Sequence, residues 1–280
     1  NMKNQDCIKI TNLKVFAYHG VFEEEKLRYF DAIYFAPDVY YSSKDEEGLS
    51  RFSFVENGTE YLFEIESEKS LSRIEYNPGN SVLMIPTSGD RQLLFYTKTG
   101  ERLWVYDEEE VVKGTELKIV RFPSVVDDVV VIISEIITES IRKAQGFKIR
   151  TGEKLWELRD DDCPDYLFEG DDKMLYGCLS IYDELVLCRL DPFTGKFDKW
   201  AVKRDKGISV CSWNVSMHNN RLYYGSNRPG CEFGIIDCGK KELVESVALD
   251  LKKGCQIGAP IVSDGKVYVF GGDELRVYEL

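Results

Sequence analysis

Three stretches of this chain carry nearly the same phrase: TGERLW at Thr99–Trp104, TGEKLW at Thr151–Trp156 and TGKFDKW at Thr194–Trp200. A weaker fourth copy, Asp237-Cys238-Gly239-Lys240, follows at a similar interval. The period is roughly 40 to 50 residues, and the repeated units are short apolar runs joined by glycine turns. Such a pattern is typical of β-sheets repeated around a central axis, as in a β-propeller.

A second kind of turn lies upstream of each Thr-Gly phrase. Asn219-Asn220, Asp264-Gly265 and the segment Gly170–Lys173 each interrupt alternating apolar residues. Asn, Asp and Gly tolerate the positive φ that a tight β-hairpin requires. We therefore expect these turns to join the inner strand of each blade to the next strand outward. The Thr-Gly phrase should then join the third strand to an outermost strand that begins near the Trp.

Applied to the whole chain, these turns divide it into six groups of strands. The groups cover residues 30–70, 71–115, 116–160, 161–204, 205–252 and 253–280. The last group has only three strands, Ile257–Val262, Lys266–Phe270 and Glu274–Leu280, so the apolar run Ile8–Tyr18 is expected to supply the fourth. That pairing would remove two exposed strand edges. The sequence thus predicts an all-β fold, a single six-bladed propeller domain over residues 1–280, with the last blade closed by the N-terminal strand.

The best helical candidate is the segment Ile136–Ala144, which reads equally well as a long strand and a hairpin. No long amphipathic helix is expected elsewhere in the chain.

The repeated turn, with Gly100, Gly152 and Gly195 followed by Trp104, Trp156 and Trp200, resembles the blade repeat of pyrroloquinoline-quinone-like β-propellers. The resemblance covers about residues 70–280 and implies the fold and a structural role for the tryptophans between blades. It implies little about activity, because that superfamily includes quinoprotein dehydrogenases, envelope assembly scaffolds and binding modules. The vicinal cysteine pair and the calcium and aspartate motifs of the dehydrogenases have no counterpart here, so we expect no quinone cofactor.

A shorter resemblance lies near the N-terminus. The segment Val15–Lys26 is similar to the start of dihydroneopterin aldolases, with His19, Gly20 and Glu25 at the matching positions of the pterin site. The rest of that family's pattern is missing. We interpret the match as a coincidence of a strand and an acidic turn, and expect no pterin site.

The formal net charge of −13 and the isoelectric point of about 4.8 narrow the choice of partner. A negative field repels phosphate backbones and anionic lipid, so nucleic acid and membrane surfaces are poor partners and a basic protein is a better one. The alternative is that the negative charge only keeps a soluble protein apart from its neighbours. No signal-peptide pattern is visible and most of the eight cysteines lie in apolar runs, which favours buried thiols and a cytoplasmic location.

Two acidic runs follow Trp-bearing outer strands. They comprise Asp107, Glu108, Glu109 and Glu110, and Asp160, Asp161 and Asp162. In a propeller both loops should lie on one face, where they could bind a basic partner. They could also be solvated loops without a partner. Their spacing lacks the alternation and glycine of a calcium loop.

Catalytic motifs are absent from the sequence: there is no nucleophile elbow, no phosphate loop and no zinc-protease helix. We therefore expect no catalytic residue, metal or cofactor, and a binding protein rather than an enzyme. One concrete form is an acidic bacterial immunity protein that neutralises a cationic toxin. The alternatives are a propeller with a small-molecule ligand or substrate in its central channel, and an envelope assembly scaffold. Aromatic residues at the predicted strand and loop ends, such as Trp213, are either blade-packing residues or interface anchors.

Overall fold

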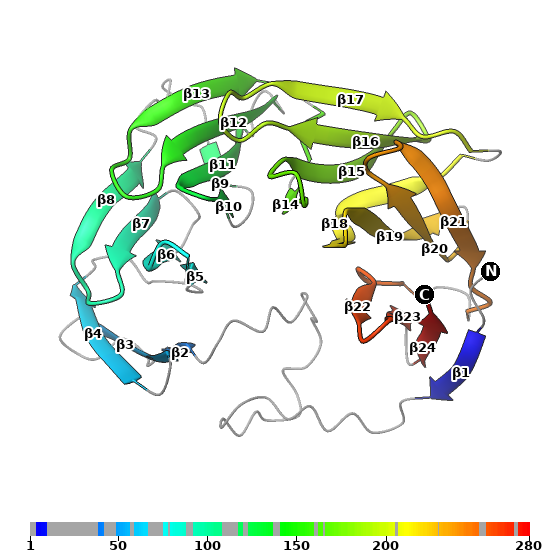
Figure 1. Cartoon of the computed structure of the whole chain (residues 1–280), viewed down its shortest axis with the longest axis horizontal. Coiled ribbons are helices and arrows are strands. Elements are labelled where there is room, and N and C mark those ends of the chain that lie inside the picture. The colour runs from blue at the N-terminus through cyan, green and yellow to red at the C-terminus, as the bar shows by residue number, and fades with distance from the viewer. Residues whose placement is uncertain are drawn as a thin grey trace. The chain divides into compact units, whose positions relative to one another are not determined.

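The structure is a computed structural model. It describes residues 4–9, 39–41, 49–56, 59–66, 75–77, 79–87, 92–107, 117–119, 123–136, 141–159, 162–164, 166–204, 207–228, 230–251, 256–271 and 274–280. All regular structure in these ranges is β-strand, and Figure 1 labels the strands in chain order. Within the same ranges no helix has the length and hydropathy that crossing a membrane requires.

The chain divides into two compact units. Unit 1 comprises Asn1–Ile33, Pro164–Asp191 and Lys196–Leu280, and unit 2 comprises Tyr34–Cys163 and Pro192–Gly195. The described strands of each unit form three antiparallel sheets, and the strands of every sheet fall inside one of the six groups that the turns predict, except β1, which joins the strands of the last group.

The sheets of unit 2 contain strands β2 to β13. The first consists of β2 (Val39–Tyr41), β3 (Leu49–Glu56) and β4 (Thr59–Glu66). The second consists of β5 (Glu75–Asn77), β6 (Val82–Pro86), β7 (Gln92–Thr97) and β8 (Arg102–Asp107). The third consists of β10 (Ser124–Val126), β11 (Val129–Ile136), β12 (Ile141–Lys148) and β13 (Lys154–Arg159), with β9 (Leu117–Ile119) paired to β11.

The sheets of unit 1 contain the remaining strands. The first consists of β14 (Phe168–Glu169), β15 (Leu175–Ile181), β16 (Glu184–Leu190) and β17 (Phe197–Ala201). The second consists of β18 (Ser209–His218), β19 (Arg221–Arg228), β20 (Glu232–Asp237) and β21 (Glu242–Ala248). The third has the order β1-β24-β23-β22, with β1 (Asn4–Lys9), β22 (Ile261–Ser263), β23 (Lys266–Gly271) and β24 (Glu274–Glu279).

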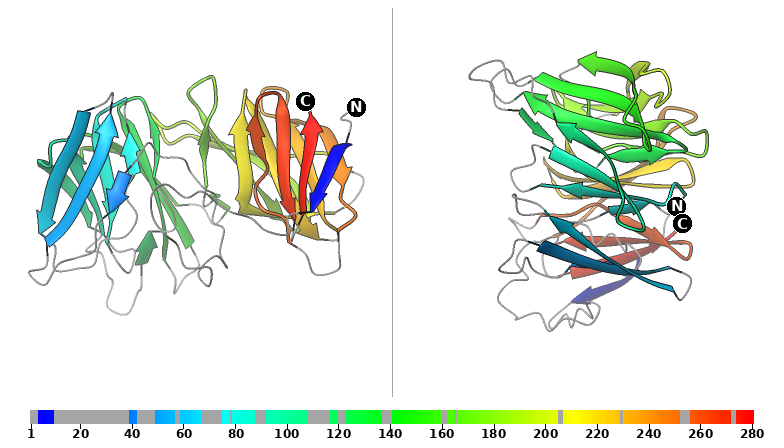
Figure 2. Two further views of the ribbon diagram at one scale, coloured as in Figure 1. Left: turned by 90° about the horizontal axis from the view of Figure 1, so that it is seen from below. Right: turned by 90° about the vertical axis from the view of Figure 1, so that its left-hand side faces the viewer.

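The N-terminal strand β1 lies beside the C-terminal strand β24, antiparallel, as Figure 2 shows. The strand occupies Asn4–Lys9, whereas the sequence predicts it within residues 8–18. The expected helical candidate is entirely β-structure where it is described, because β11 ends at Ile136 and β12 begins at Ile141. Its β-branched residues favour a pleated surface over a helix.

The two predicted classes of turn are both confirmed. Asn219 and Asn220, with φ of 48° and 55°, join β18 to β19, and Asp264 and Gly265 join β22 to β23 with φ of 51° and 70°. Positive φ at both central residues matches the twist of a two-residue hairpin. The Thr-Gly phrases lie between β7 and β8, β12 and β13, and β16 and β17, as expected.

The tryptophans of the repeat pack on these turns. In unit 2, the Trp104 indole Nε1–H donates to the Ile149 carbonyl oxygen at 2.7 Å, and the ring lies against Gly152. Trp156 repeats this arrangement on the carbonyl of Pro192, at 2.7 Å, and on Gly195. A Cβ on either glycine would stand within 2.7 Å of the indole, so only glycine allows the approach. Trp104 and Trp156 thus each pack on the Thr-Gly turn that follows in sequence.

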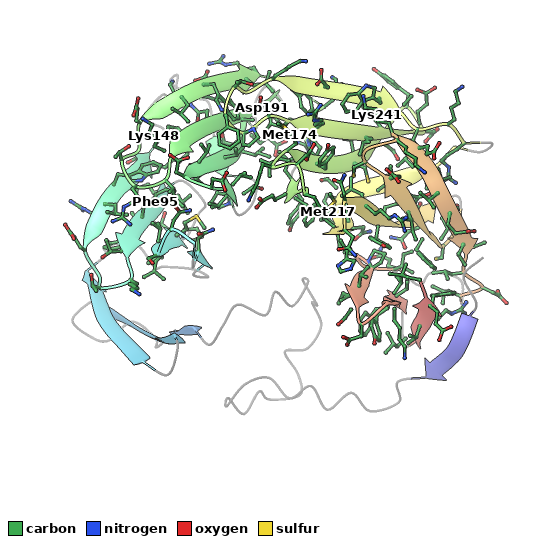
Figure 3. The ribbon with its side chains drawn as sticks, in the orientation of Figure 1. Phe95, Lys148, Met174, Asp191, Met217 and Lys241 are labelled. Carbon is green, nitrogen blue, oxygen red and sulfur yellow. The ribbon has the colours of Figure 1, made fainter. Side chains whose placement is uncertain are left out.

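The fourth copy of the repeat differs from the sequence prediction. Gly239 was expected to hold the glycine position, but the left-handed residue of this turn is Lys241, with φ of 60°. The Lys241 amide donates to the Asp237 carbonyl at 2.8 Å, as the Gly152 amide donates to Lys148 at 2.9 Å. Lys241, labelled in Figure 3, therefore occupies the position that Gly152 occupies in its own turn.

The cores lie between sheets of the same unit. In unit 2, Phe95, Tyr106, Ile132 and Phe147 belong to one buried cluster with the partly buried Trp104 packed against it. In unit 1, Cys178 and Cys238 belong to a second cluster. Burial raises the pKa of the Cys238 thiol to about 12 and also raises that of Cys178, so both stay protonated. The prediction of buried thiols is confirmed for Cys163, Cys178, Cys188 and Cys238, and Cys211 and Cys231 are partly exposed.

Candidate functional site

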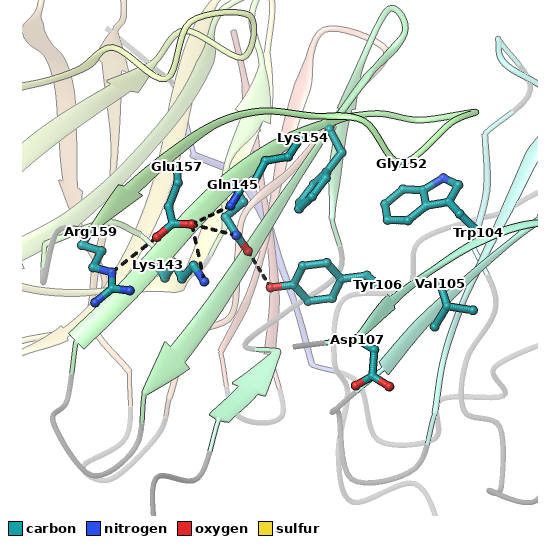
Figure 4. Close-up of a pocket in the computed structure, with 11 residues that line it drawn as sticks. Trp104, Val105, Tyr106, Asp107, Lys143, Gln145, Gly152, Lys154, Glu157 and Arg159 are labelled. Atoms are coloured by element: carbon teal, nitrogen blue, oxygen red, sulfur yellow. Dashed lines mark hydrogen bonds and ion pairs between the residues drawn. The ribbon is translucent and has the colours of Figure 1, made fainter. Parts of the chain in front are cut away.

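The candidate site is an open pocket of about 620 Å³ in unit 2. Its walls come from the end of β8 (Trp104–Asp107), from alternate residues of β12 and from β13 with its preceding turn, as Figure 4 shows. β8 and β13 both end here, because Asp107 and Arg159, the last residues of the two strands, line the same pocket. The outermost strands of two neighbouring sheets thus build the site.

A chain of hydrogen bonds crosses the pocket from β8 to β13. The Tyr106 hydroxyl donates to Gln145 Oε1 at 2.7 Å, and Gln145 Nε2 donates to Glu157 Oε2 at 3.1 Å. Gln145 is 3% exposed, and both ends of its amide have partners. The amide orientation is therefore determined, and Gln145 holds Glu157 in a fixed place.

Three cations converge on the Glu157 carboxylate. Its oxygens lie 3.6 Å from Lys143 Nζ, 3.2 Å from Lys154 Nζ and 3.5 Å from Arg159 Nε. Lys143 is 5% exposed, whereas the Lys154 and Arg159 side chains are about half-exposed. Burial raises the pKa of Glu157, but the hydrogen bond from Lys154 and the charge of Lys143 outweigh burial, and the net pKa is lowered. Glu157 is therefore ionised at neutral pH.

The aromatic part of the pocket is rigid. The Trp104 ring stacks on Phe95 with centroids 3.9 Å apart and planes 7° from parallel. Phe147 contacts Trp104 at 5.5 Å and meets Tyr106 edge-on at 5.5 Å. These rings pack beside the polar residues, so the polar groups of β12 and β13 are the part of the pocket that can bind a polar ligand.

The predicted acidic residues are only partly within the described structure. Asp107 is exposed, accepts a hydrogen bond from Gln92 and lines the pocket. Asp162 is partly exposed in the turn after β13. Glu108, Glu109, Glu110, Asp160 and Asp161 lie outside the described residues, as do His19, Gly20 and Glu25 of the pterin-site resemblance.

Sequence reasoning missed the residues at the centre of the pocket. Lys143 and Gln145 lie two apart in β12, so they share a face of the sheet, and that face also carries the apolar Phe147. Buried polar residues in such an alternation were the available signal. Their pairing with Arg159 and Glu157 across the β12–β13 ladder is not readable from the sequence, because a bulge shifts the register between Gly146 and Phe147.

Unit 1 contains a second buried polar cluster. Arg204 binds the Glu232 carboxylate through two nitrogens, at 2.7 and 3.1 Å, and also donates to the Tyr224 hydroxyl at 2.6 Å. The Tyr224 hydroxyl and Ser246 each donate to the same Glu232 oxygen, at 3.2 and 3.1 Å. Burial lowers the pKa of Arg204, but the bond to Glu232 outweighs it and the net pKa is raised. This closed cluster is structural.

Three aromatic side chains in the described part of unit 1 are exposed, among them Phe270 of β23. Tyr182 is 97% exposed in the β15–β16 turn with φ of 49°, and Trp213 in β18 is 50% exposed. Phe168, in contrast, packs against a core cluster. Among the described residues no group of His, Cys, Asp and Glu is arranged to hold a metal ion.

Comparisons with known proteins show the fold. No protein-family model and no curated protein matches the chain. A chain of the crystal structure of the Mitotic Checkpoint Complex is 13% identical, with a TM-score of 0.56 over 87% of this chain and 73% of that one. The β-propeller domain of Myceliophteria thermophila Cps50 (Swd1) is also 13% identical, with a TM-score of 0.54 over 84% and 77%. At this identity the likeness establishes a β-propeller fold and nothing about activity.

Proposed function

We propose that this chain is a non-enzymatic β-propeller that binds a basic protein. The observation that carries the proposal is the shared end point of β8 and β13 at one pocket. The first acidic run begins at Asp107 within that pocket, and the second follows Arg159 directly in sequence. Two carboxylate runs that follow these strand ends in sequence, in a chain of net charge −13, would attract a cationic surface.

The full architecture in this proposal is a single domain of residues 1–280 with six blades. The β1–β24 pairing and the six groups of strands support a ring closed by the N-terminal strand. The packing of Trp104 on Gly152 and of Trp156 on Gly195 supports a repeat of the pyrroloquinoline-quinone-like type. A rigid ring presents its loops as a preorganised surface, which lowers the entropic cost of binding.

The biological form that we propose is a cytoplasmic bacterial immunity protein. A toxin that cleaves nucleic acid needs a cationic active site to attract phosphate, and an acidic protein can occupy such a site by imitating that charge. The mechanism is occlusion: long-range attraction raises the association rate, and contacts at the loops then hold the complex. It requires no nucleophile, metal or cofactor from this chain.

The test is to mix the purified chain with the purified product of each gene adjacent to its own and to measure binding and toxin activity. Binding should weaken as the salt concentration rises, because screening shortens the range of the attraction.

The triple variant Glu108→Gln/Glu109→Gln/Glu110→Gln should lower the association rate by about tenfold. The control Glu101→Gln/Asp171→Asn/Asp264→Asn removes the same charge from exposed turns and should change it by less than about twofold. Equal effects of the two variants, or a complex insensitive to salt, would contradict charge imitation.

A further inference from the structure

The Glu157 pocket is locally positive within an acidic protein. Its lining contains three basic residues, Lys143, Lys154 and Arg159, and two acidic ones, Glu157 and Asp107. All three cations contact the single carboxylate of Glu157. Asp107 lies on the β8 wall and accepts a hydrogen bond from Gln92. A concave site with apolar walls concentrates the field of such a charge excess.

The geometry of this cluster differs from that of a closed structural ion pair. In the Arg204–Glu232 pair, the guanidinium makes two hydrogen bonds of 2.7 and 3.1 Å, and the two side chains are 10% and 16% exposed. Around Glu157 the cation distances are 3.2 to 3.6 Å, and two of the three cations are about half-exposed. Charge-assisted hydrogen bonds are normally 2.7 to 2.9 Å long. Lys154 is thus hydrogen-bonded to Glu157, whereas Lys143 and Arg159 are held near the carboxylate at longer ion-pair distances.

The size of the pocket indicates a small ligand. A volume of about 620 Å³ lies within the range of small-molecule sites, roughly 300 to 1,000 Å³. The acidic runs beginning at Asp107 and following Arg159 disfavour a large polyanion such as nucleic acid. Gln145 and Tyr106 fix the base of the site, so the anion would meet a preorganised set of donors.

We propose that this pocket binds the phosphate or carboxylate group of a small polar molecule, between Lys143, Lys154 and Arg159. This site shares its pocket with the proposal of a protein partner above, but it depends on the cations of β12 and β13 and not on the acidic loops. Glu157 is a positioning residue that holds the three cations together in the absence of ligand.

Glu157 also makes the proposal sharply testable, because its carboxylate competes with the ligand for the same cations. We would titrate inorganic phosphate and, separately, acetate into the whole chain and follow the indole N–H signal of Trp104 and the side-chain amide of Gln145 by NMR. Glu157→Gln should bind phosphate about tenfold more tightly than the unmodified chain, since one opposing charge is removed. A damaged or misfolded variant would not gain affinity.

The opposite change is Lys154→Gln/Arg159→Gln, which should weaken phosphate binding by about tenfold or more. The matched control is Lys148→Gln, at a half-exposed lysine of β12 outside the pocket, which should change the affinity by less than about twofold. A preference for phosphate over acetate would assign the group as phosphate, and the reverse as carboxylate. Equal affinities in Glu157→Gln and the unmodified chain, or an equal loss in Lys148→Gln, would overturn the proposal, as would the absence of binding by either anion.

Discussion

The ammonium group of Lys241 lies 3.8 Å from the centre of the Trp200 ring. Trp104 and Trp156 cover a glycine at the equivalent turn position, whereas Trp200 is covered by a cation. A lysine above an indole gains a cation–π interaction that partly offsets its left-handed backbone. The fourth repeat thus places a lysine against the tryptophan at the position where the other turns have a glycine.

We expect Lys241→Gln to lower the free energy of unfolding by about 1 kcal/mol, because it removes the cation and keeps the strained backbone. Lys241→Gly should be less harmful, since glycine relieves the left-handed conformation at the same position. Urea denaturation provides the measurement. The neighbouring exposed Lys240→Gln is the control, and an equal loss in both glutamine variants would show that the ring contact contributes nothing.

The close approach of Trp104 to Gly152 predicts a larger cost for alanine there than at Gly265. Both glycines have φ near 70°, but a Cβ on Gly265 would meet nothing within 4 Å, whereas one on Gly152 would meet the indole at 2.7 Å. Gly265→Ala should therefore cost about 1 kcal/mol from backbone strain alone. Gly152→Ala should cost roughly 2 to 4 kcal/mol, because the Trp104 ring must also move. Similar unfolding midpoints for the two variants would mean that the ring relaxes freely.

The Arg204–Glu232 pair predicts that the free energy of unfolding depends strongly on both side chains. Arg204→Met should lower the free energy of unfolding by about 3 kcal/mol, because it leaves the largely buried Glu232 carboxylate without its cation. Arg204→Lys should have a free energy of unfolding between those of Arg204→Met and the unmodified chain, because lysine keeps the charge but cannot make the bidentate contact. The double variant Arg204→Met/Glu232→Leu should recover most of the loss. If the double variant is no more stable than Arg204→Met, the cost arises from packing of the arginine stem instead.

The lowered pKa of Glu157 predicts how the free energy of unfolding depends on pH. A carboxyl group with a lower pKa in the folded state stabilises the fold above its unfolded pKa of about 4.3, and this contribution disappears as the pH falls through the folded value. Glu157→Gln should therefore cost about 1 kcal/mol at pH 7 and almost nothing near pH 3. Urea denaturation of Glu157→Gln and of the unmodified chain at the two pH values measures this difference in the free energy of unfolding.

The control for this pH dependence is Glu153→Gln. Glu153 pairs with Lys148 on the surface, where both side chains are about half-exposed. Solvent screens such a pair, so no pH-dependent difference should be measurable. A constant deficit of Glu157→Gln at every pH would show that the carboxylate charge is not what stabilises the cluster.

Several features of the fold could be predicted because they are local. Positive φ at Gly152, Gly195 and Asn220 follows from residue type within a few positions, and so do the hairpins that these turns create. The boundaries of the strand groups follow from the same turns. The fourth turn was misplaced at Gly239 because the left-handed position is set by the hydrogen bond from Lys241 to Asp237, which the residue types do not indicate.

What the sequence by itself determined was the repeat: the period, the two classes of turn and the all-β character, each a property of neighbouring residues. The tertiary structure decided which distant residues meet. Tyr106 reaches Gln145 across 39 positions, and three cations gather on Glu157 because β12 and β13 pair side by side. Backbone conformation depends on short-range sterics, so it can be predicted from the types of neighbouring residues. The position of a charge relative to another depends on how whole sheets pack, and only the folded arrangement fixes it.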